Sequence, residues 1–321
     1  MGSNTQLQTN QTIDLINCSS MDEFQNNLIS IYERIEKDGF VIIQGWDTSD
    51  ETFKEIAQFF GHIQDHPKAD EFGVVNMRTE HPNKPNNAHE RFNGYVRGDF
   101  LPHTDGAYLD GYGIVNGKVV KLNSPKFLIL QCIQPAEQGG ASFIVDTQEI
   151  FQQLWDKEPE HTQVLTQSKT VSFCLGDVFS TYCPIFEQIS NESWRVRWRS
   201  DIMYIEPWAY SSVKHIAQNY LLNPKFRKQH RLTEGQILIA DNHRVLHGRD
   251  AVTADNIEKP RLLNKTLIWD DSTDCMLPFM DPIPDPFSFR AFNNYLPLNV
   301  DKPHNRLRPI QTGIKLKGSS T

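Results

Sequence analysis

The residue types best suited to chemistry stand in the segment His103-Thr104-Asp105. Side chains two residues apart on an extended strand point to the same face, so one imidazole and one carboxylate would converge there. A second imidazole from elsewhere would complete two histidines and one carboxylate on one face of a divalent metal ion, with the opposite positions open for chemistry. His247, in the segment Leu246-His247-Gly248-Arg249, is the candidate for that second imidazole.

A second histidine competes for this role. His243 lies four residues before His247, and residues four apart share a face on a helix and on a straight strand alike. Spacing alone therefore leaves both as alternatives. The other histidines carry no partnered pattern, and we expect them to lie on the surface or to be satisfied by hydrogen bonds: His62, His66, His81, His89, His161, His215, His230 and His304.

Beyond His247 the chain runs through a predicted strand, 261–269. Alternation along this strand puts Arg261 and Lys265 on the same side. Two cations on the inner side of a site would suit an anionic co-substrate.

Two apolar segments, 127–132 and 142–146, are predicted strands on either side of a Gly139-Gly140 turn. In order and residue type these features resemble the taurine dioxygenase-like (TauD/TfdA) family of Fe(II)- and 2-oxoglutarate-dependent oxygenases. Glutarate hydroxylase-like members share the sequence motifs His-Thr-Asp-Gly and Leu-His-Gly-Arg-Asp. The resemblance covers roughly residues 38–270. It implies an all-β core with flanking helices, a double-stranded β-helix (jelly-roll, cupin-like) barrel.

The resemblance also assigns the site. It implies that His103, Asp105 and His247 bind Fe(II), so it favours His247 over His243. It further implies that Arg261 grips the distal carboxylate of 2-oxoglutarate.

Two positions depart from the family pattern. Ser142 stands where the family usually has a threonine that contacts the co-substrate, and the serine keeps the hydroxyl. Lys265 stands where many relatives carry a second arginine that contacts the co-substrate or the substrate. Lysine keeps the charge but loses the planar, two-pronged fork.

The reaction follows from the same resemblance. Fe(II) takes about six ligands, so three protein ligands leave room for a chelating 2-oxo acid and O2. Oxidative decarboxylation would yield succinate, CO2 and a species that attacks an unactivated C–H bond. Halogenating relatives lack the carboxylate of Asp105, so hydroxylation is favoured. Desaturation or oxidative cyclisation would need the same ligands and only a different substrate placement.

Two other classes of function are alternatives. One is a metal-bound sensing or binding protein that performs no chemistry, against which the full ligand set and Arg261 argue. The other is a zinc hydrolase, which would have no use for Arg261.

Arginines near the motifs indicate the substrate. In the predicted strand 194–199, alternation gathers three arginines on one face, which is either a solvated edge or a carboxylate-binding surface. We expect Arg195, the first of these arginines, to be solvated. Arg199, Arg197 and Arg97 are the predicted substrate contacts, and with Lys265 they indicate a small carboxylate-bearing or amino-acid-like substrate.

Length and composition favour one domain. A chain of 321 residues that is 38% hydrophobic can bury a substantial core. We expect a polar N-terminal segment, 1–20, and one oxygenase domain, 21–321, with the metal-binding jelly-roll core at about 95–270. The tail, 275–321, is rich in proline and aromatic residues. It is expected to wrap the barrel, and contact with a second subunit in a homo-oligomer is the alternative.

Charge and cysteine usage exclude several classes. A net charge of −8 without a basic cluster argues against a nucleic-acid partner. No segment has the apolar character of a signal peptide or a membrane span. No Cys-x-x-Cys pair indicates a zinc ribbon or a disulfide framework, so a reducing cytoplasm fits best. The five cysteines are Cys18, Cys132, Cys174, Cys183 and Cys275.

Several elements can be placed from the sequence. A capping box at Ser20 opens a helix that Gly39 ends, a strand at 40–43 follows, and a second helix spans 50–60. A further amphipathic helix is predicted at 211–222.

Two segments lie beside the metal motif. The prolines and asparagines of 76–98 predict an irregular loop, either a lid or an exposed connection. Asn116-Gly117 between β-branched residues predicts a hairpin at 112–122, either a wall of the site's mouth or a surface hairpin.

Overall fold

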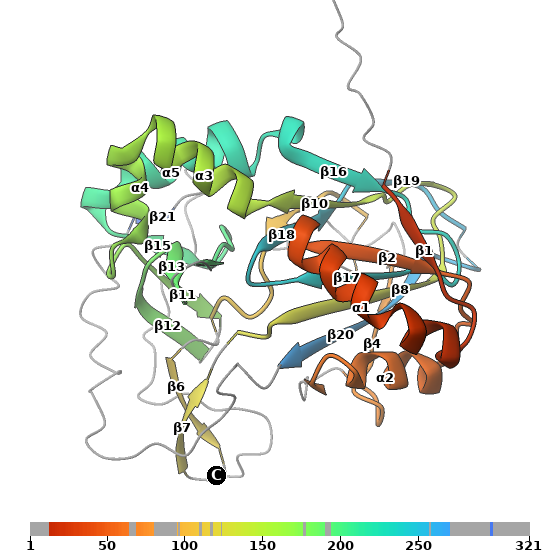
Figure 1. Cartoon of the computed structure of the whole chain (residues 1–321). Helices are drawn as coiled ribbons and strands as arrows, with labels where there is room; N and C mark the ends of the chain where they lie inside the picture. Colours follow the sequence, from red (N-terminus) through yellow and green to blue (C-terminus); the bar gives the residue numbers. More distant parts are fainter. Residues whose placement is uncertain are drawn as a thin grey trace, which may run out of the picture.

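The computed structural model describes residues 13–63, 69–79, 95, 97–108, 111–115, 118–122, 124–175, 178–189, 194–256, 258–269 and 296–297. Two main sheets carry the architecture, and helices cover the outer side of each (Figure 1). The predicted β core with flanking helices is therefore present, as mixed sheets.

The larger sheet has seven described strands. β1 and β2 run parallel, and the other neighbours are antiparallel. Its strands, in spatial order and with β4 also paired to β20, are β1 (Leu15–Asn17), β2 (Phe40–Gln44), β17 (Ile237–Asp241), β8 (Phe127–Gln134), β20 (Leu262–Trp269), β3 (His62–Ile63) and β4 (Val75–Arg78).

The smaller sheet is antiparallel and holds four described strands. In spatial order they are β16 (Arg227–His230), β10 (Ser142–Asp146), β18 (Val245–Arg249) and β5 (Phe100–His103). The glycines at 139 and 140 both have positive φ, 74° and 67°, and the chain passes there from β8 of the larger sheet to β10 of the smaller one.

Two helices cover the outer face of the larger sheet (Figure 1). α1 (Met21–Asp38) begins at Ser20, whose side chain accepts a hydrogen bond from the backbone N–H of Glu23 at 3.2 Å. It ends at Gly39, where a φ of 79° lets the chain turn directly into β2. α2 spans Asp50–Gln58, so the predicted helices and the buried strand between them are confirmed.

The other helices cover the smaller sheet. They are α3 (Thr147–Lys157), α4 (Pro159–Thr166) and α5 (Tyr210–Ile216), which continues into a π-helical turn, η3 (Ala217–Leu221). Two short 3-10 turns flank α5 and η3: η2 (Pro207–Ala209) and η4 (Pro224–Phe226). The predicted helix at 211–222 thus exists but changes its winding halfway.

The remaining described strands form smaller sheets. One contains β12 (Val178–Cys183), β11 (Val171–Leu175), β15 (Met203–Ile205) and β21 (Leu296–Pro297), and the pairs are β13 (Phe186–Gln188) with β14 (Trp194–Val196), β9 (Gln138–Gly139) with β19 (Val252–Ala254), and β6 (Gly111–Val115) with β7 (Lys118–Leu122).

Strand alternation divides the core into layers. On β2, Phe40 packs between the two main sheets, while Val41 packs under the N-terminal helices. From the smaller sheet, Ile144 and Val245 join the cluster between the sheets. Residues at even spacing from these two on β10 and β18 therefore also face the larger sheet, and this set includes His247.

The structure corrects two expectations about strands. The irregular loop expected from position 76 begins later, because β4 continues through Arg78 by pairing with β20. The predicted strand 194–199 ends at Val196, since its partner β13 provides only three residues. Most of the 76–98 loop lies outside the described residues.

The hairpin expected at 112–122 is confirmed as the β6–β7 pair. Its role as a wall of the site stays a prediction. Within the predicted tail the described residues are Leu296 and Pro297, which pair with β15, and the rest lies outside them. The boundaries of the N-terminal segment and of the single domain are likewise untested.

Candidate metal centre

Two neighbouring strands bring the two histidines together. His103 on β5 and His247 on β18 are paired directly across the ladder. Their ring centroids lie 4.2 Å apart. Both side chains are buried and face the larger sheet.

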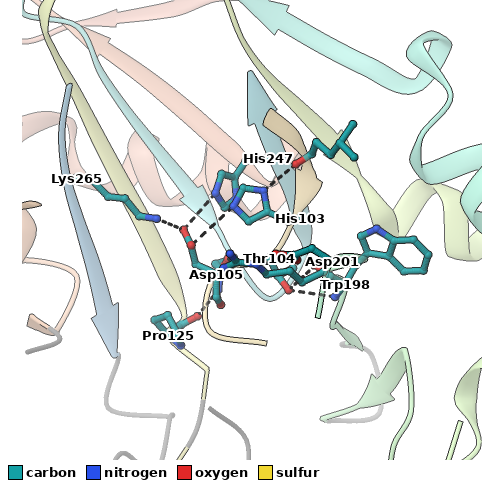
Figure 2. A network of polar contacts seen from close by, with 11 residues as sticks. His103, Thr104, Asp105, Pro125, Trp198, Asp201, His247 and Lys265 are labelled. Carbon is teal, nitrogen blue, oxygen red and sulfur yellow. Dashed lines mark hydrogen bonds and ion pairs between the residues drawn. The ribbon is translucent and has the colours of Figure 1, made fainter. Parts of the chain in front are cut away.

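Asp105 completes the group from the turn after β5. Its carboxylate lies 3.2 Å from His247 Nε2 and 3.8 Å from His103 Nε2. One ligand atom from each of the three residues lies within 4.8 Å of the others. Figure 2 shows the two rings pointing at the carboxylate from one side. A single strand was expected to align His103 with Asp105, but β5 ends at His103, so a turn brings the carboxylate into place.

Asn242 fixes this turn, and the sequence did not indicate it. Its side-chain oxygen accepts a hydrogen bond from the Asp105 N–H at 2.8 Å, and its amide donates to the Asp105 carbonyl at 2.9 Å. The same amide donates to the Pro125 carbonyl at 2.8 Å, and the side chain is buried. The available signal in the sequence was a polar residue directly after an apolar predicted strand.

The protonation states suit a divalent metal. Burial lowers the pKa of His103 well below its ordinary value, and the neighbouring His247 lowers it further. Burial also lowers the pKa of His247, although Asp105 acts in the opposite direction. Both rings are therefore neutral at neutral pH, as ligands must be.

The carboxyl group of Asp105 is ionised. Burial alone would raise its pKa, but the charge of Lys265 and the hydrogen bond with His247 hold it well below its usual range. The His103 Nδ1 lies 2.9 Å from the Leu101 carbonyl, so it can donate its proton there and leave Nε2 as the ligand atom. This donor set fits the Fe(II) that the sequence motifs imply.

Lys265 reaches the centre from β20 of the opposite sheet. Its Nζ lies 2.5 Å from the Asp105 carboxylate (Figure 2). The ammonium therefore lies against the metal-binding group itself, on the inner side that strand alternation predicted.

A second buried group of cations lies close by. The pKa of Arg261 is lowered to about 9, first by burial and then by the nearby Arg249. Arg249 is itself buried, donates to the Gly98 carbonyl and has a pKa of about 10, lowered by burial. Ser142 is paired with Arg249 across the ladder and faces the same side. Two buried guanidiniums beside a hydroxyl form a site that suits a carboxylate.

Arg249 was not predicted. It follows His247 by two residues on β18, so alternation could have placed it on the inner face. Arg261 packs on the glycine turn: a Cβ added at Gly140 would lie 3.3 Å from its Cδ.

The three arginines that were predicted to contact the substrate have different partners in the structure. Arg199 pairs with Asp201 at 3.2 Å and is close enough to the metal-binding group for its charge to lower the pKa of both histidines. Arg197 is fully buried against Glu187 at 2.5 Å. Arg97 donates to the Asp255 carbonyl at 3.3 Å.

Two nearby side chains differ from simple expectation. Arg195 was expected to be solvated, but it is buried because Glu187 on the paired strand accepts a hydrogen bond from it at 2.5 Å. His243, the alternative ligand, hydrogen-bonds to the Ser124 carbonyl at 3.0 Å and is not part of the metal-binding group.

Two histidines and a carboxylate on the inner face of a two-sheet fold, beside buried arginines, are typical of non-haem Fe(II) oxygenases. The chain belongs to the family described as taurine catabolism dioxygenase TauD, TfdA family, which it matches over residues 10–266. This confirms the predicted family, and the curated relatives that the chain matches are dioxygenases.

Solved structures share the fold. An asparagine oxygenase in complex with Fe(II), 2S,3S-3-hydroxyasparagine and succinate matches with a TM-score of 0.61 at 13% identity, over 77% of this chain and 79% of that one. The non-haem iron oxygenase OrfP in complex with Fe and α-ketoglutaric acid matches with a TM-score of 0.53 at 14% identity, over 78% and 80%.

A relative in sequence is the uridine-5'-phosphate dioxygenase of a Streptomyces species. It is 27% identical over 177 residues, which is 51% of this chain and 60% of that protein's length. Among the described residues, we find no helix with the length and apolar character needed to cross a bilayer.

Proposed function

We propose that this protein uses Fe(II), 2-oxoglutarate and O2 to hydroxylate an unactivated C–H bond of a small carboxylate-bearing or amino-acid-like molecule, releasing succinate and CO2. The observation that supports it most is the buried triad of two neutral histidines and one ionised aspartate beside a buried arginine pair. A zinc hydrolase would have no use for Arg261 and Arg249.

In this proposal His103, Asp105 and His247 hold the iron, and Asn242 keeps the carboxylate in position. When bound, Fe(II) and 2-oxoglutarate supply the activation of O2 that C–H oxidation needs. Arg261 and Arg249 grip the distal carboxylate of the co-substrate, and Ser142 contributes a hydroxyl.

The substrate would lie near the remaining cations. Arg199 is the best-placed candidate for a substrate carboxylate, because its charge reaches both histidines. Lys265 can contact either the co-substrate or the substrate. Arg197 and Arg97 have carboxylate or carbonyl partners already, so we propose a supporting role for them. The same ligands would serve desaturation or oxidative cyclisation, with substrate placement deciding the outcome.

The proposal includes the setting of the site. We propose that the two main sheets close as a double-stranded β-helix within one domain, and that the protein functions in the cytoplasm. Its net charge of −8 disfavours a nucleic-acid partner. The buried cysteines Cys18 and Cys132 form no disulfide, which fits a reducing compartment.

The test is anaerobic addition of Fe(II) and then 2-oxoglutarate, with detection of the weak visible band of a chelated iron–2-oxo acid complex. We expect a band in the wild-type protein. Arg261→Ala and Arg249→Ala should each weaken 2-oxoglutarate binding roughly 10- to 100-fold, because each removes a charge-assisted hydrogen-bond donor.

Arg34→Ala is the matched control, since Arg34 forms a partly exposed ion pair with Asp14 at 3.4 Å. It should leave the band unchanged. Iron binding without any band would contradict the co-substrate assignment. Succinate release stimulated by amino acids or dicarboxylates would identify the substrate class, and a rate that none of them raises would count against it.

A further inference from the structure

A second cluster of ligand-type side chains lies on the helices that cover the smaller sheet. Glu158 lies at the junction of α3 and α4, His161 on the first turn of α4, and His215 near the end of α5. One ligand atom from each lies within 4.8 Å of the others, and all three residues are half-buried. They are sequence-distant from the triad and belong to different elements.

The three side chains are already oriented towards one another. The imidazole rings of His161 and His215 stack with centroids 4.2 Å apart and an interplanar angle of 23°. His215 Nε2 lies 2.5 Å from one oxygen of Glu158. The other oxygen accepts a hydrogen bond from the Tyr220 hydroxyl at 2.7 Å.

Further hydrogen bonds fix the outer side of each ring. His161 Nδ1 lies 2.9 Å from the hydroxyl of Ser212, which is buried. Because the serine oxygen can accept a hydrogen bond from the Nδ1–H group, His161 Nε2 can serve as a ligand atom. The side-chain nitrogen of Asn219 lies 3.1 Å from His215 Nδ1 and can donate a hydrogen bond to it, which fixes the orientation of that ring.

From this arrangement we propose a second metal site, formed by Glu158, His161 and His215, for a divalent cation of the zinc type. Two imidazoles and a carboxylate are a donor set that Zn(II) accepts, with water in the fourth position. The side chains of His215 and Glu158 are 32% and 25% exposed, so an ion and its water can enter from solvent.

The local winding supports the site. The π-helical turn η3 directly follows α5 and carries both Tyr220 and Asn219, the two residues that hold Glu158 and His215. Single π-helical turns are frequent at functional sites because they change which side chains share a face. A bound ion would tie α4 to α5 across the cluster that Leu165 and Val213 help to form.

The proposal does not rest on the oxygenase function, and its test separates the two sites. Co(II), a visible spectroscopic probe for zinc-type sites, is titrated into wild-type protein and into His161→Ala/His215→Ala. We expect two equivalents bound by the wild type and one by the double variant. Zn(II) should raise the melting temperature of an Asp105→Ala variant, and adding His161→Ala should remove that rise.

His230→Ala is the matched control, because His230 is a half-buried histidine that hydrogen-bonds to Gln236. It should retain both equivalents. If His161→Ala/His215→Ala fails to fold, His161→Gln keeps a polar side chain and should still lose one equivalent. Equal stoichiometry in wild type and variants would overturn the proposal, and the cluster would then be an ion pair that only joins helices.

Discussion

At the scale of single residues, the metal centre depends on side chains that never touch the metal. Asn242 makes two hydrogen bonds to the backbone of Asp105 and one to Pro125. These bonds hold a turn whose carboxylate would otherwise have several orientations. Residues of this kind orient the ligands and thereby raise the affinity of a metal site.

Asn242→Ala should therefore weaken metal binding while leaving all three ligands in the chain. Loss of such a supporting hydrogen bond typically lowers metal affinity roughly 10- to 100-fold. Titration with Mn(II), monitored by electron paramagnetic resonance, measures the change. Asn27→Ala, which removes an exposed hydrogen bond to the Glu23 carbonyl on α1, should have no effect. Unchanged metal affinity in Asn242→Ala would show that the turn keeps its conformation without the Asn242 side chain.

Cys132 gives a prediction about pH. Burial raises the pKa of its thiol to about 11, from an ordinary value of 9.0. Above pH 9 the unfolded chain ionises this thiol while the folded protein does not, so the free energy of unfolding falls between pH 9 and 11. The loss attributable to Cys132 should approach about 2–3 kcal/mol.

Urea unfolding at pH 8 and pH 10.5 tests this, with Cys132→Ala as the comparison. The variant is less stable at pH 8 because it leaves a cavity between the sheets. Its stability should decline less between the two pH values than that of the wild type. Parallel declines would contradict the assignment.

At the scale of elements, the β10–β18–β5 ladder sets the spacing of the site. Gly248 lies between His247 and Arg249 on β18, where the neighbouring strands approach closely. A Cβ added there would lie 2.3 Å from Phe143 Cζ and 2.5 Å from the Phe100 carbonyl oxygen. The backbone carbonyl cannot move away without moving β5, and β5 carries His103.

Gly248→Ala should consequently lower the free energy of unfolding by about 1–3 kcal/mol, as overpacking does, and should also weaken metal binding. Gly98→Ala is the matched control, because nothing lies within 4 Å of a Cβ added at that position. Thermal unfolding and Mn(II) titration measure the two effects. A stable Gly248→Ala protein with full metal affinity would contradict this description of the ladder.

At the scale of the whole molecule, one side chain joins the layers. Arg244 pairs with Asp146, the residue before α3, at 2.6 Å. It also donates to the carbonyl groups of Glu36 and Lys37 in the last turn of α1. The two helical layers on opposite sides of the sheets are thus connected through a single guanidinium.

Arg244→Ala should lower the free energy of unfolding by about 3 kcal/mol, because it leaves the buried carboxylate of Asp146 without its cation. The exposed pair of Arg34 provides the comparison, since Arg34→Ala should cost about 0–1 kcal/mol. Chemical denaturation measures both. Equal effects would mean that Arg244 contributes no more than a surface charge.

Local pattern in the sequence was sufficient for much of this protein. The cap at Ser20, the positive φ required at Gly39 and the alternation of Arg261 with Lys265 are local properties of a few neighbouring residues. The hairpin at 112–122 depends on its own turn residues. The metal-binding motif is also local, so the sequence alone was sufficient to recognise it and the family that it resembles.

Tertiary structure decided the rest. Whether His243 or His247 faces Asp105 depends on which strand β18 pairs with, and pairing joins residues far apart in the chain. Glu187 buries Arg195 and Arg197, so alternation alone mistook the row of three arginines for one surface. His161 and His215 share no spacing pattern, and only the packing of α4 on α5 brings them together, because contacts between elements are set by burial of apolar faces and not by local sequence.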